Sequence, residues 1–255
     1  MKDKIESIIS SYVDEFSRRN NVKTRWKSPI VGFAAVNDPL FNELKSAVGP
    51  EHMIPIDFSP NAKTVISYFL PFENSIPESN DNGKRESSEE WVIAYIETNK
   101  LLSELSSHLF EEIEKLGYEC YDYPVKYVFD KVNDISNWSQ RHIAYIAGVG
   151  TFGLNNMMIT KDGCCGRLGS VVTSMDISPT SRASVESCLF KRNGTCKLCV
   201  DRCVAEALHP DSGFERFACD KICNENSQRY SYLGNFDGCC GKCLVGMPCS
   251  TRAPF

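Results

Sequence analysis

The segment Ala147–Asn156 reads AGVGTFGLNN, and Gly148, Gly150 and Gly153 form a G-x-G-x-x-G pattern within it. This pattern binds dinucleotides where it follows a strand, opens a helix and has an acidic residue about 20 positions further on. Here the preceding segment, SNWSQRHIAYI, carries its apolar residues at helical spacing. Asp176, the nearest acidic candidate, falls at the start of an expected loop. The pattern therefore favours the end of a helix, where glycine supplies the left-handed residue, over a dinucleotide turn.

The segments on both sides of the glycine stretch alternate between helical and strand-like apolar patterns. Such a mixture over about 175 residues indicates an α/β or α+β core. The polar segment 75–88, which contains Pro, Asn and Gly, is expected to be a loop. The expected helices are 5–16, 39–48, 91–116 and the segment before the glycines, and the expected strands are 30–36, 63–72, 124–129, 157–160 and 168–174.

Composition limits the classes of function. The chain has 255 residues, of which 42% are hydrophobic, so it can bury a core. The formal net charge is −5, and no broad basic surface suggests a nucleic-acid partner. The first residues are charged throughout, unlike a signal peptide, and no apolar run is long enough to span a bilayer. We therefore expect a soluble, cytoplasmic protein without a membrane partner.

The composition changes after about residue 175. The segment 176–187, DISPTSRASVES, is rich in serine and poor in apolar residues, so we expect a linker. Beyond it the chain is rich in Cys, Gly and Asn and shows little periodicity, and such a segment needs a covalent or metal framework. We predict a first domain over 1–178 and a second over 179–255.

Cysteine is the most informative residue type in this sequence. There are 13 cysteines, and all except Cys120, Cys164 and Cys165 lie between Cys188 and Cys249. This density occurs in disulfide scaffolds of secreted chains, but without an export signal, in a chain of this size, metal ligation is the better interpretation. Cys164 and Cys165 are candidates for extra ligands, redox thiols or buried apolar residues.

The spacing of the cysteines is typical of an iron–sulfur module. Cys196-x2-Cys199-x3-Cys203 matches the last part of the bacterial two-cluster ferredoxin run, C-x2-C-x2-C-x3-C-P. Cys188 lies further upstream than that run requires, and Val204 stands in place of the proline. Zinc sites also use paired C-x2-C motifs, so structural zinc remains an alternative, as do disulfides.

Read together with this module, the glycine stretch resembles a known family. WSQRHIAYIAGVGTFGLNNMMIT followed by LGSVVT resembles the epoxyqueuosine reductases, which are related to the corrinoid reductive dehalogenases, and FSPNAKTVISYFLPF resembles a segment near their start. The resemblance covers about residues 30–249. It implies an α+β protein in which a cobalamin-binding domain of nitroreductase-like topology precedes a two-cluster ferredoxin-like module. The glycines would then let the backbone approach a flat macrocycle closely.

The two-cluster precedent leads us to predict two [4Fe–4S] clusters with crossed ligation. Cys223 is an alternative to Cys219, and Cys239 is an alternative to Cys240, because each pair is close in sequence. The predicted ligands are Cys188, Cys196, Cys199 and Cys249 for one cluster and Cys203, Cys219, Cys240 and Cys243 for the other.

The resemblance also implies roles for residues around the glycines. Asp134 takes the place of the family's proton-donating aspartate, but it is equally a candidate cap for a helix near Asn137. A solvated helix face is the alternative role of the two basic candidates, and a plain helix end that of the glycines. The predicted cofactor contacts are Arg141, His142, Gly148, Gly150, Gly153 and Asn155.

Three positions depart from the family pattern, in which Glu, Trp and Lys stand where this sequence has Gln140, Phe152 and Leu154. The helical repeats that help full-length members hold tRNA do not follow the cysteine module here. Together with the net charge, this leads us to expect weak or no tRNA binding.

The sequence therefore predicts a cobalamin-dependent iron–sulfur reductase of a small substrate such as an epoxide or a halide. Its electrons would come from a flavodoxin or a ferredoxin. The alternatives are a ferredoxin-type electron carrier without a corrinoid, a zinc-stabilised interaction protein, and an epoxyqueuosine reductase that acts on tRNA.

Overall fold

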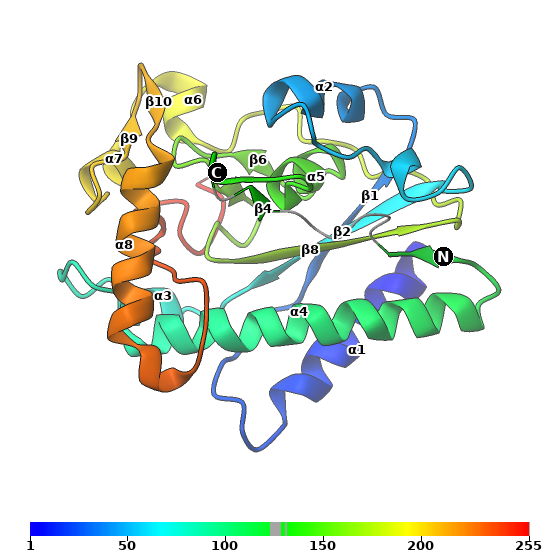
Figure 1. Ribbon diagram of the computed structural model, residues 1–255, viewed down its shortest axis with the longest axis horizontal. Coiled ribbons are helices and arrows are strands. Elements are labelled where there is room, and N and C mark those ends of the chain that lie inside the picture. The colour runs from blue at the N-terminus through cyan, green and yellow to red at the C-terminus, as the bar shows by residue number, and fades with distance from the viewer. Residues whose placement is uncertain (123–128, 131, 255) are drawn as a thin grey trace.

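The structure is a computed structural model that describes residues 1–122, 129–130 and 132–254 (Figure 1). Its centre is a four-stranded sheet with the strand order β1-β2-β8-β3, and every pairing in it is antiparallel. The chain is therefore an α+β protein, as predicted. The strands are β1 (Ile30–Ala35), β2 (Thr64–Pro71), β8 (Gly166–Thr173) and the short β3 (Cys120–Tyr121). Most of the expected strand 124–129 lies outside the described residues.

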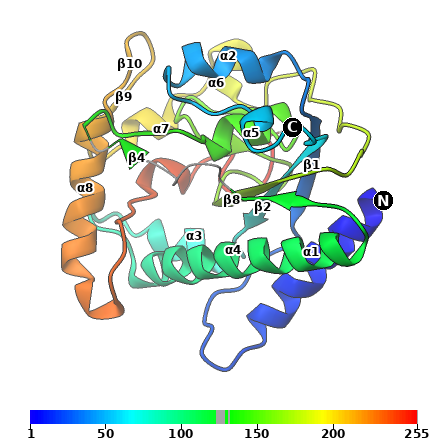
Figure 2. The same ribbon diagram turned by 45° about the vertical axis from the view of Figure 1, so that its right-hand side comes forward.

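Two helices cover one face of the sheet, α1 (Lys2–Ser17) and the long α4 (Glu89–Lys115) (Figures 1 and 2). Ser88 begins α4 as its N-cap, and its side chain accepts a hydrogen bond from the Trp91 backbone N–H. The apolar stripe predicted for α1 is buried against a matching stripe of α4 and against β2. The buried residues of these stripes are Ile5, Ile9, Val13 and Phe16 in α1 and Leu101, Leu105, Leu109 and Ile113 in α4.

The opposite face of the sheet packs against α5 (Gln140–Ile146), with α2 (Leu40–Ala47) next to it. Trp138, directly before α5, is 1% exposed and donates from its ring N–H to the Ser170 hydroxyl at 3.0 Å. Its ring lies against His52, in a stacked arrangement. The short helix η1 (Pro55–Asp57) lies between α2 and β2 in the chain.

The glycine stretch does end α5, as predicted. Gly148 follows the last turn with a φ of +75°, the left-handed conformation that glycine adopts without strain. A Cβ on Gly150 would lie 2.3 Å from the Ile159 carbonyl oxygen, across the hairpin that the glycines begin. These two glycines are explained by the packing of the chain on itself. The hairpin consists of β6 (Thr151–Phe152) and β7 (Met158–Ile159).

The segment 176–187, expected to be a linker, is fixed along the edge of the sheet. Thr180 donates its backbone N–H to the Phe33 carbonyl at 2.8 Å and accepts a bond from the Phe33 N–H at its hydroxyl. Arg182 forms an ion pair with Asp38 at 2.5 Å. The serine-rich composition indicated an irregular segment, and the structure has one there. The hydrogen bonds between Thr180 and Phe33 attach this segment to β1.

The cysteine-rich part of the chain consists of short elements packed against α3 (Ser75–Asn80) and the start of α4. The predicted loop 75–88 thus contains a helix. The Asn80 side-chain amide donates to the Cys240 carbonyl at 3.0 Å, and the buried Lys242 ammonium donates to the Asn80 carbonyl at 2.8 Å. The elements are α6 (Leu189–Asn193), α7 (Leu198–Asp201), β9 (Leu208–His209), β10 (Gly213–Phe214), α8 (Arg216–Arg229), η2 (Ser231–Leu233) and η3 (Lys242–Leu244).

The two predicted domains share one apolar cluster. Phe72, Trp91 and Val92 pack with Leu244 and Val245 from the cysteine-rich part. The domain boundary between residues 178 and 179 stays a prediction. The residues before and after it pack together in this cluster.

Candidate functional site

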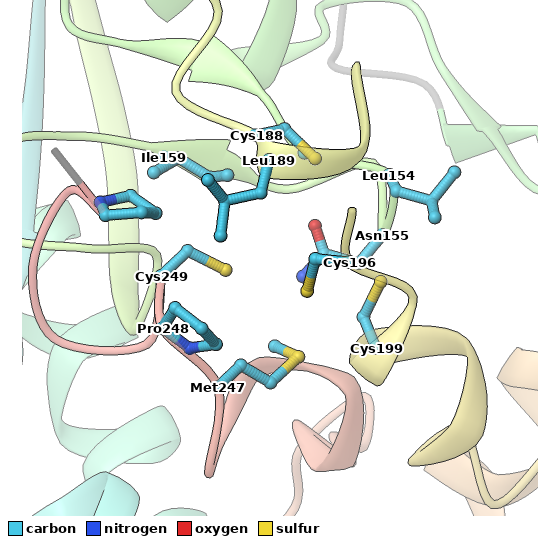
Figure 3. Close-up of a pocket in the computed structure, with 12 residues that line it drawn as sticks. Leu154, Asn155, Ile159, Cys188, Leu189, Cys196, Cys199, Met247, Pro248 and Cys249 are labelled. Carbon is cyan, nitrogen blue, oxygen red and sulfur yellow. The ribbon is translucent and has the colours of Figure 1, made fainter. Parts of the chain in front are cut away.

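The first cysteine group comprises Cys188, Cys196, Cys199 and Cys249, and these four residues line one pocket. Figure 3 shows their sulfur atoms arranged around a common space. Cys188 begins α6, while Cys196 and Cys199 lie on either side of the start of α7, and Cys249 comes from the last segment of the chain. Gly194, with a φ of +75°, ends α6 and turns the chain back toward the pocket. This is the set predicted for one cluster, and its ligation stays a prediction.

The walls of this pocket join the glycine stretch to the cysteine module. Asn155 lines the pocket, and its side-chain amide donates to the Cys243 carbonyl at 2.9 Å. Gly153 lines the same pocket. Leu154 and Met247 add apolar surface to it. The structure thus places two of the predicted cofactor contacts against the first cysteine group.

The second cysteine group comprises Cys203, Cys219, Cys240 and Cys243. Burial raises the pKa of the Cys243 thiol, and the charges of Cys240, Cys203 and Cys219 raise it further. Burial likewise raises the pKa of Cys240 to about 11, with Cys219 and Cys203 as neighbouring charges. Cys203, Cys219 and Cys240 all act on Cys243, so the four residues lie near one another. This is the set predicted for the other cluster.

The protonation of these thiols indicates what the groups need. Burial raises the pKa of Cys199 to about 12, and the charges of Cys249, Cys188 and Cys196 add to the effect. Only the thiolate binds a metal, so buried thiolates that repel one another need a positive centre between them. Within the described part of the chain, no three Cys, His, Asp or Glu side chains lie close enough to hold a single ion.

Two alternative ligands lie beside the second group. Cys223 is hydrogen-bonded to Cys219, and this bond together with burial raises the pKa of Cys223. Burial raises the pKa of Cys239 to about 12. Both residues also line a large cavity, together with Cys164. The choice between Cys219 and Cys223, and between Cys240 and Cys239, stays a prediction.

Cys164 and Cys165 are buried between the first group and that cavity. The Cys165 thiol donates to the Leu244 carbonyl at 3.2 Å. Cys164 is hydrogen-bonded to Cys165 and to Cys249, and the bond to Cys165 raises its pKa. Cys164 therefore packs as a buried, protonated thiol beside the buried Cys165.

The large cavity has a volume of about 340 Å³ and is lined by residues from α4, α5, β8 and the cysteine-rich part. A second cavity of about 310 Å³ continues along β8 beside α4. The two share Gln140, Arg167 and Leu168 as lining residues. Among the described residues, β3 pairs with β8 at Val172 and Thr173. Arg167, Leu168, Gly169 and Ser170 of β8 line the cavities.

Two polar atoms in the shared wall are buried and have no hydrogen-bond partner among the described residues. They are the side-chain carbonyl oxygen of Gln140 and the Nε of Arg167. The Arg167 guanidinium lies over the Tyr95 ring, 4.2 Å from its centre. An unpaired buried polar atom costs about 1–3 kcal/mol unless water or a ligand meets it.

Arg141 and His142 are neighbours in α5 but have different surroundings. Arg141 lines the 340 Å³ cavity and donates to the Asn156 carbonyl at 3.0 Å. Burial lowers its pKa, as does Arg216, whereas Cys219 and Asp134 raise it. The His142 ring packs against Phe152 and is hydrogen-bonded to Ser139.

Burial lowers the pKa of His142 to about 4, with Arg141 adding to the effect. The ring is therefore neutral at pH 7, and His142 lines neither large cavity. The prediction that His142 binds an anionic cofactor edge gains no support from this placement.

Asp134 lies at the end of the hairpin formed by β4 (Phe129–Asp130) and β5 (Ile135–Ser136). Its φ is +53°, a conformation that aspartate adopts in turns. Burial raises the pKa of its carboxyl group, as does Asp220, whereas Arg216 and Arg141 lower it.

The helix-cap alternative for Asp134 is wrong, because α5 begins at Gln140 with Ser139 as its N-cap. A carboxyl group that donates a proton needs apolar neighbours, and Val132 and Trp138 are the candidates near Asp134 in sequence. Val132 is 80% exposed, and Trp138 is buried in the core.

Arg167 and Tyr95 line the large cavity but were not predicted as site residues. A signal for Arg167 was present, because it is a charged residue in the strand CCGRLGSVVT, which is otherwise apolar or small. Such a residue is buried only where it has a partner or a ligand. Tyr95 gave no signal, since it fits the helical stripe of α4.

An antiparallel α+β core, two sets of four neighbouring cysteines and an adjoining cavity define a class of cysteine-rich α+β proteins. Solved structures with this fold are epoxyqueuosine reductases, so the predicted resemblance is confirmed at the level of the fold. The structure from Streptococcus thermophilus is 17% identical, with a TM-score of 0.55, and the match covers 95% of this chain and 67% of that one.

Two further structures add detail. The Bacillus subtilis epoxyqueuosine reductase, solved with a catalytic aspartate loop swung out of its active site, is 16% identical with a TM-score of 0.53, over 98% of this chain and 67% of that one. A third, solved with an epoxyqueuosine-modified tRNA-Tyr stem loop, is 17% identical with a TM-score of 0.51, over 97% of this chain and 65% of that one. This chain thus spans about two thirds of the length of each.

No family model matches the sequence, and no curated protein matches it. The structure with a tRNA stem loop weighs against our expectation that tRNA is an unlikely partner. None of the helices in the described residues is both long and apolar enough to span a membrane.

Proposed function

We propose that the protein is an iron–sulfur oxidoreductase of the epoxyqueuosine reductase type, which passes single electrons from two [4Fe–4S] clusters to a corrinoid. The observation that carries this proposal is the position of the large cavity. It is lined by Arg141 next to the second cysteine group and by Cys164, which is hydrogen-bonded to Cys249 of the first group. A ferredoxin-type carrier needs clusters but no such cavity.

The two cysteine groups suit clusters in their chemistry. The first group lines one pocket with four thiols, the second brings four thiols near one another, and a cubane cluster takes four thiolate ligands. The backbone N–H of Ala207 donates to the Cys203 sulfur at 3.3 Å, and hydrogen bonds of this kind tune the potential of a cluster. Structural zinc in both groups is the competing proposal.

The cavity suits a corrinoid in its polar groups. A corrin ring carries peripheral amides, which both donate and accept hydrogen bonds. The unpaired Gln140 oxygen is an acceptor for an amide N–H, and the unpaired Arg167 Nε is a donor for an amide oxygen. When bound, the group supplies a cobalt centre that accepts single electrons. Gln140, Arg167 and the cavity-lining residues of β8 would hold the ring and exclude water from it.

Arg141 and Asp134 have complementary roles in this proposal. The buried Arg141 guanidinium stabilises negative charge that develops in the cavity. Reductive opening of a carbon–oxygen bond leaves negative charge on oxygen, and the Asp134 carboxyl, whose pKa is raised by burial, supplies the proton. Asp134 lies on the hairpin and lines neither cavity, so we propose that the hairpin brings it to the substrate. The aspartate loop that is swung out in the Bacillus subtilis structure supports such a movement.

The substrate class follows from the same comparison. An epoxide carried on a tRNA stem loop is the substrate to test first, because a protein of this fold was solved with an epoxyqueuosine-modified stem loop. A free small epoxide or halide is the second candidate, and the net charge of −5 favours it.

Anaerobic purification followed by iron, sulfide, zinc and cobalt analysis tests the cofactors, and a visible spectrum distinguishes the classes. Cluster absorbance together with corrin bands supports the proposal, clusters alone support an electron carrier, and a colourless zinc protein contradicts both. The substrate is then tested with reductant and an epoxyqueuosine-containing stem loop, using mass spectrometry of the nucleoside product. An unmodified stem loop is the control.

A further inference from the structure

The surface above the first cysteine group carries an unusual concentration of positive charge. Residues 186–202, which contain α6 and α7, carry the basic residues Lys191, Arg192, Lys197 and Arg202 and the acidic residues Glu186 and Asp201, although the chain as a whole has a net charge of −5. Asp201 is exposed at the end of α7. The three basic residues Lys191, Arg192 and Lys197 are also exposed. They lie on α6 and at the start of α7, at the periphery of the molecule in both views (Figures 1 and 2).

The basic side chains are held over aromatic rings rather than extended at random. The Lys197 ammonium lies 5.5 Å from the centre of the Phe190 ring, and the Lys191 ammonium lies 5.7 Å from that of Phe152. Leu198, between two cysteines of the group, is 42% exposed. The patch therefore combines an apolar centre with a basic rim, directly over Cys196 and Cys199. We call Lys191, Arg192, Lys197 and Leu198 the α6–α7 patch.

The surface beside the second cysteine group is less basic. Cys219 belongs to α8, in which the acidic Asp220 and Glu225 accompany the basic Arg216, Lys221 and Arg229. Basic residues exceed acidic ones by one in α8 and by two in the segment 186–202. Of the two groups, the first therefore has the more basic surface.

We propose that the α6–α7 patch is the docking surface for an acidic one-electron carrier protein, which delivers electrons to the cluster of the first cysteine group. This inference rests on the proposed function, because it requires that the group holds a cluster. A reduced flavodoxin gives up one electron, its flavin hydroquinone becomes the semiquinone, and the cluster gains that electron. The charge of the patch is complementary to such a carrier, and electron-transfer encounters are small, short-lived and steered by charge.

The test measures how fast reduced flavodoxin, an acidic flavoprotein, reduces the clusters of the reconstituted full-length protein in anaerobic stopped flow. The variant Lys191→Glu, Lys197→Glu reverses two charges of the patch. We expect its bimolecular rate at low ionic strength to fall about 10-fold or more, because steering raises association rates by 10–10³. The difference should shrink as salt is added, because screening shortens the reach of the charges.

The matched control is Lys4→Glu, Lys23→Glu, which changes the net charge equally at exposed positions in α1 and just after it. We expect this control to stay within about 2-fold of the wild type, since only local charge steers docking. Equal slowing in both variants, or slowing in neither, contradicts the docking surface.

A second reductant separates this inference from the proposed function. Dithionite needs no docking surface, so it should reduce the clusters of all variants alike. Wild-type protein without clusters would overturn the proposed function and the docking surface together. If the reversed pair fails to load its clusters, the neutral pair Lys191→Gln, Lys197→Gln replaces it, and an unchanged, salt-independent rate in that variant rejects the docking surface.

Discussion

The two cysteine groups each contain four thiols, but their surroundings differ. The first lies at the periphery, beneath α6 and α7, with Cys196 half-buried and a basic surface above it. The second lies between α8 and η3, where its four cysteines are half-buried and Arg141 and Asp134 act on Cys219. Under the proposed function, electrons enter at the first group, which we call the outer group, and leave from the second or inner group, whose neighbour Arg141 lines the cavity.

The same difference predicts unequal potentials. Hydrogen bonds to sulfur and nearby positive charge favour the reduced form of a cluster. Both groups have a hydrogen bond to sulfur, from the Ala207 N–H to Cys203 and between Cys164 and Cys249. The positive charges near the first group are exposed and screened by solvent, whereas Arg141 acts on Cys219 from the wall of the cavity. We therefore expect the inner cluster to be the easier one to reduce.

Removing one ligand from each group has the largest expected effect. Cys199→Ser and Cys243→Ser should each lose one cluster, so that iron falls from about eight to about four per chain. Iron and sulfide analysis of anaerobically purified variants measures this, and circular dichroism verifies that the variants are folded. The inner variant should lose the more easily reduced signal and the outer variant the other one.

Cys120→Ser is the control, because Cys120 lies in β3 and belongs to neither group. It should keep all its iron. About four irons in the wild-type protein would rule out two clusters and leave the inner or the outer group without one.

Asp134→Asn tests whether chemistry occurs on the inner side. The substitution keeps the shape of the side chain but removes the transferable proton, so turnover should fall by about 10²–10⁴-fold. Iron content should not change, because the predicted cluster ligands are all cysteines. Cobalt content should not change either, because Asp134 lines neither large cavity. Turnover equal to that of the wild type would remove Asp134 from the mechanism, leaving Arg141 or Tyr145 as the next groups to test.

The extent to which the sequence predicts this molecule differs between its regions. Strands such as 30–36 and helices such as 91–116 were predicted correctly, because burial imposes a regular apolar period on them. The helix α3 was missed, since its sequence SIPESN is polar and contains proline. It forms because Asn80 and Ile76 are buried against the cysteine module, which is a tertiary contact with no local signal.

The site shows the same division. The short spacing of Cys196 and Cys199 indicated that these two thiols lie together, and they line one pocket, because a short spacing on one turn limits where the sulfurs can point. The glycines were predicted to face a macrocycle, but Gly150 faces the Ile159 carbonyl and Gly153 faces the first pocket. A requirement for glycine reveals a close approach, and the identity of the approaching group depends on the fold.

Asn155 physically connects the two groups, since it lines the outer pocket and donates to the backbone of the inner ligand Cys243. Its side-chain oxygen also accepts a bond from the Met157 N–H. Asn155→Ala should therefore lower the free energy of unfolding by about 1–3 kcal/mol. Asn193→Ala, an exposed amide that bonds only within its own turn, should change it by about 0.5 kcal/mol or less. Chemical denaturation under anaerobic conditions compares the two, and equal effects would mean that Asn155 does not connect the groups.

The smallest effect concerns whether α5 presents one cation or two to the inner group. Arg141 is charged at every accessible pH, whereas burial and Arg141 hold the pKa of His142 at about 4. The unfolded chain has a histidine pKa near 6.5, so it binds a proton between pH 6.5 and 4 that the folded protein does not. Stability must therefore fall as the pH falls through this window and stay level above it.

The variant His142→Gln isolates this contribution, because the pKa of His52 is also lowered by burial and gives a slope of the same sign in both proteins. Between pH 7.5 and pH 5, the wild type should lose about 1 kcal/mol more than the variant, after allowance for solvent screening of the half-buried ring. For a chain of this size, that is about 2–4 °C in the thermal midpoint. A wild type that instead gains stability toward pH 5 would mean that His142 is protonated in the fold. The helix α5 would then carry a second cation beside Arg141. The difference in positive charge between the surroundings of the two cysteine groups would change accordingly.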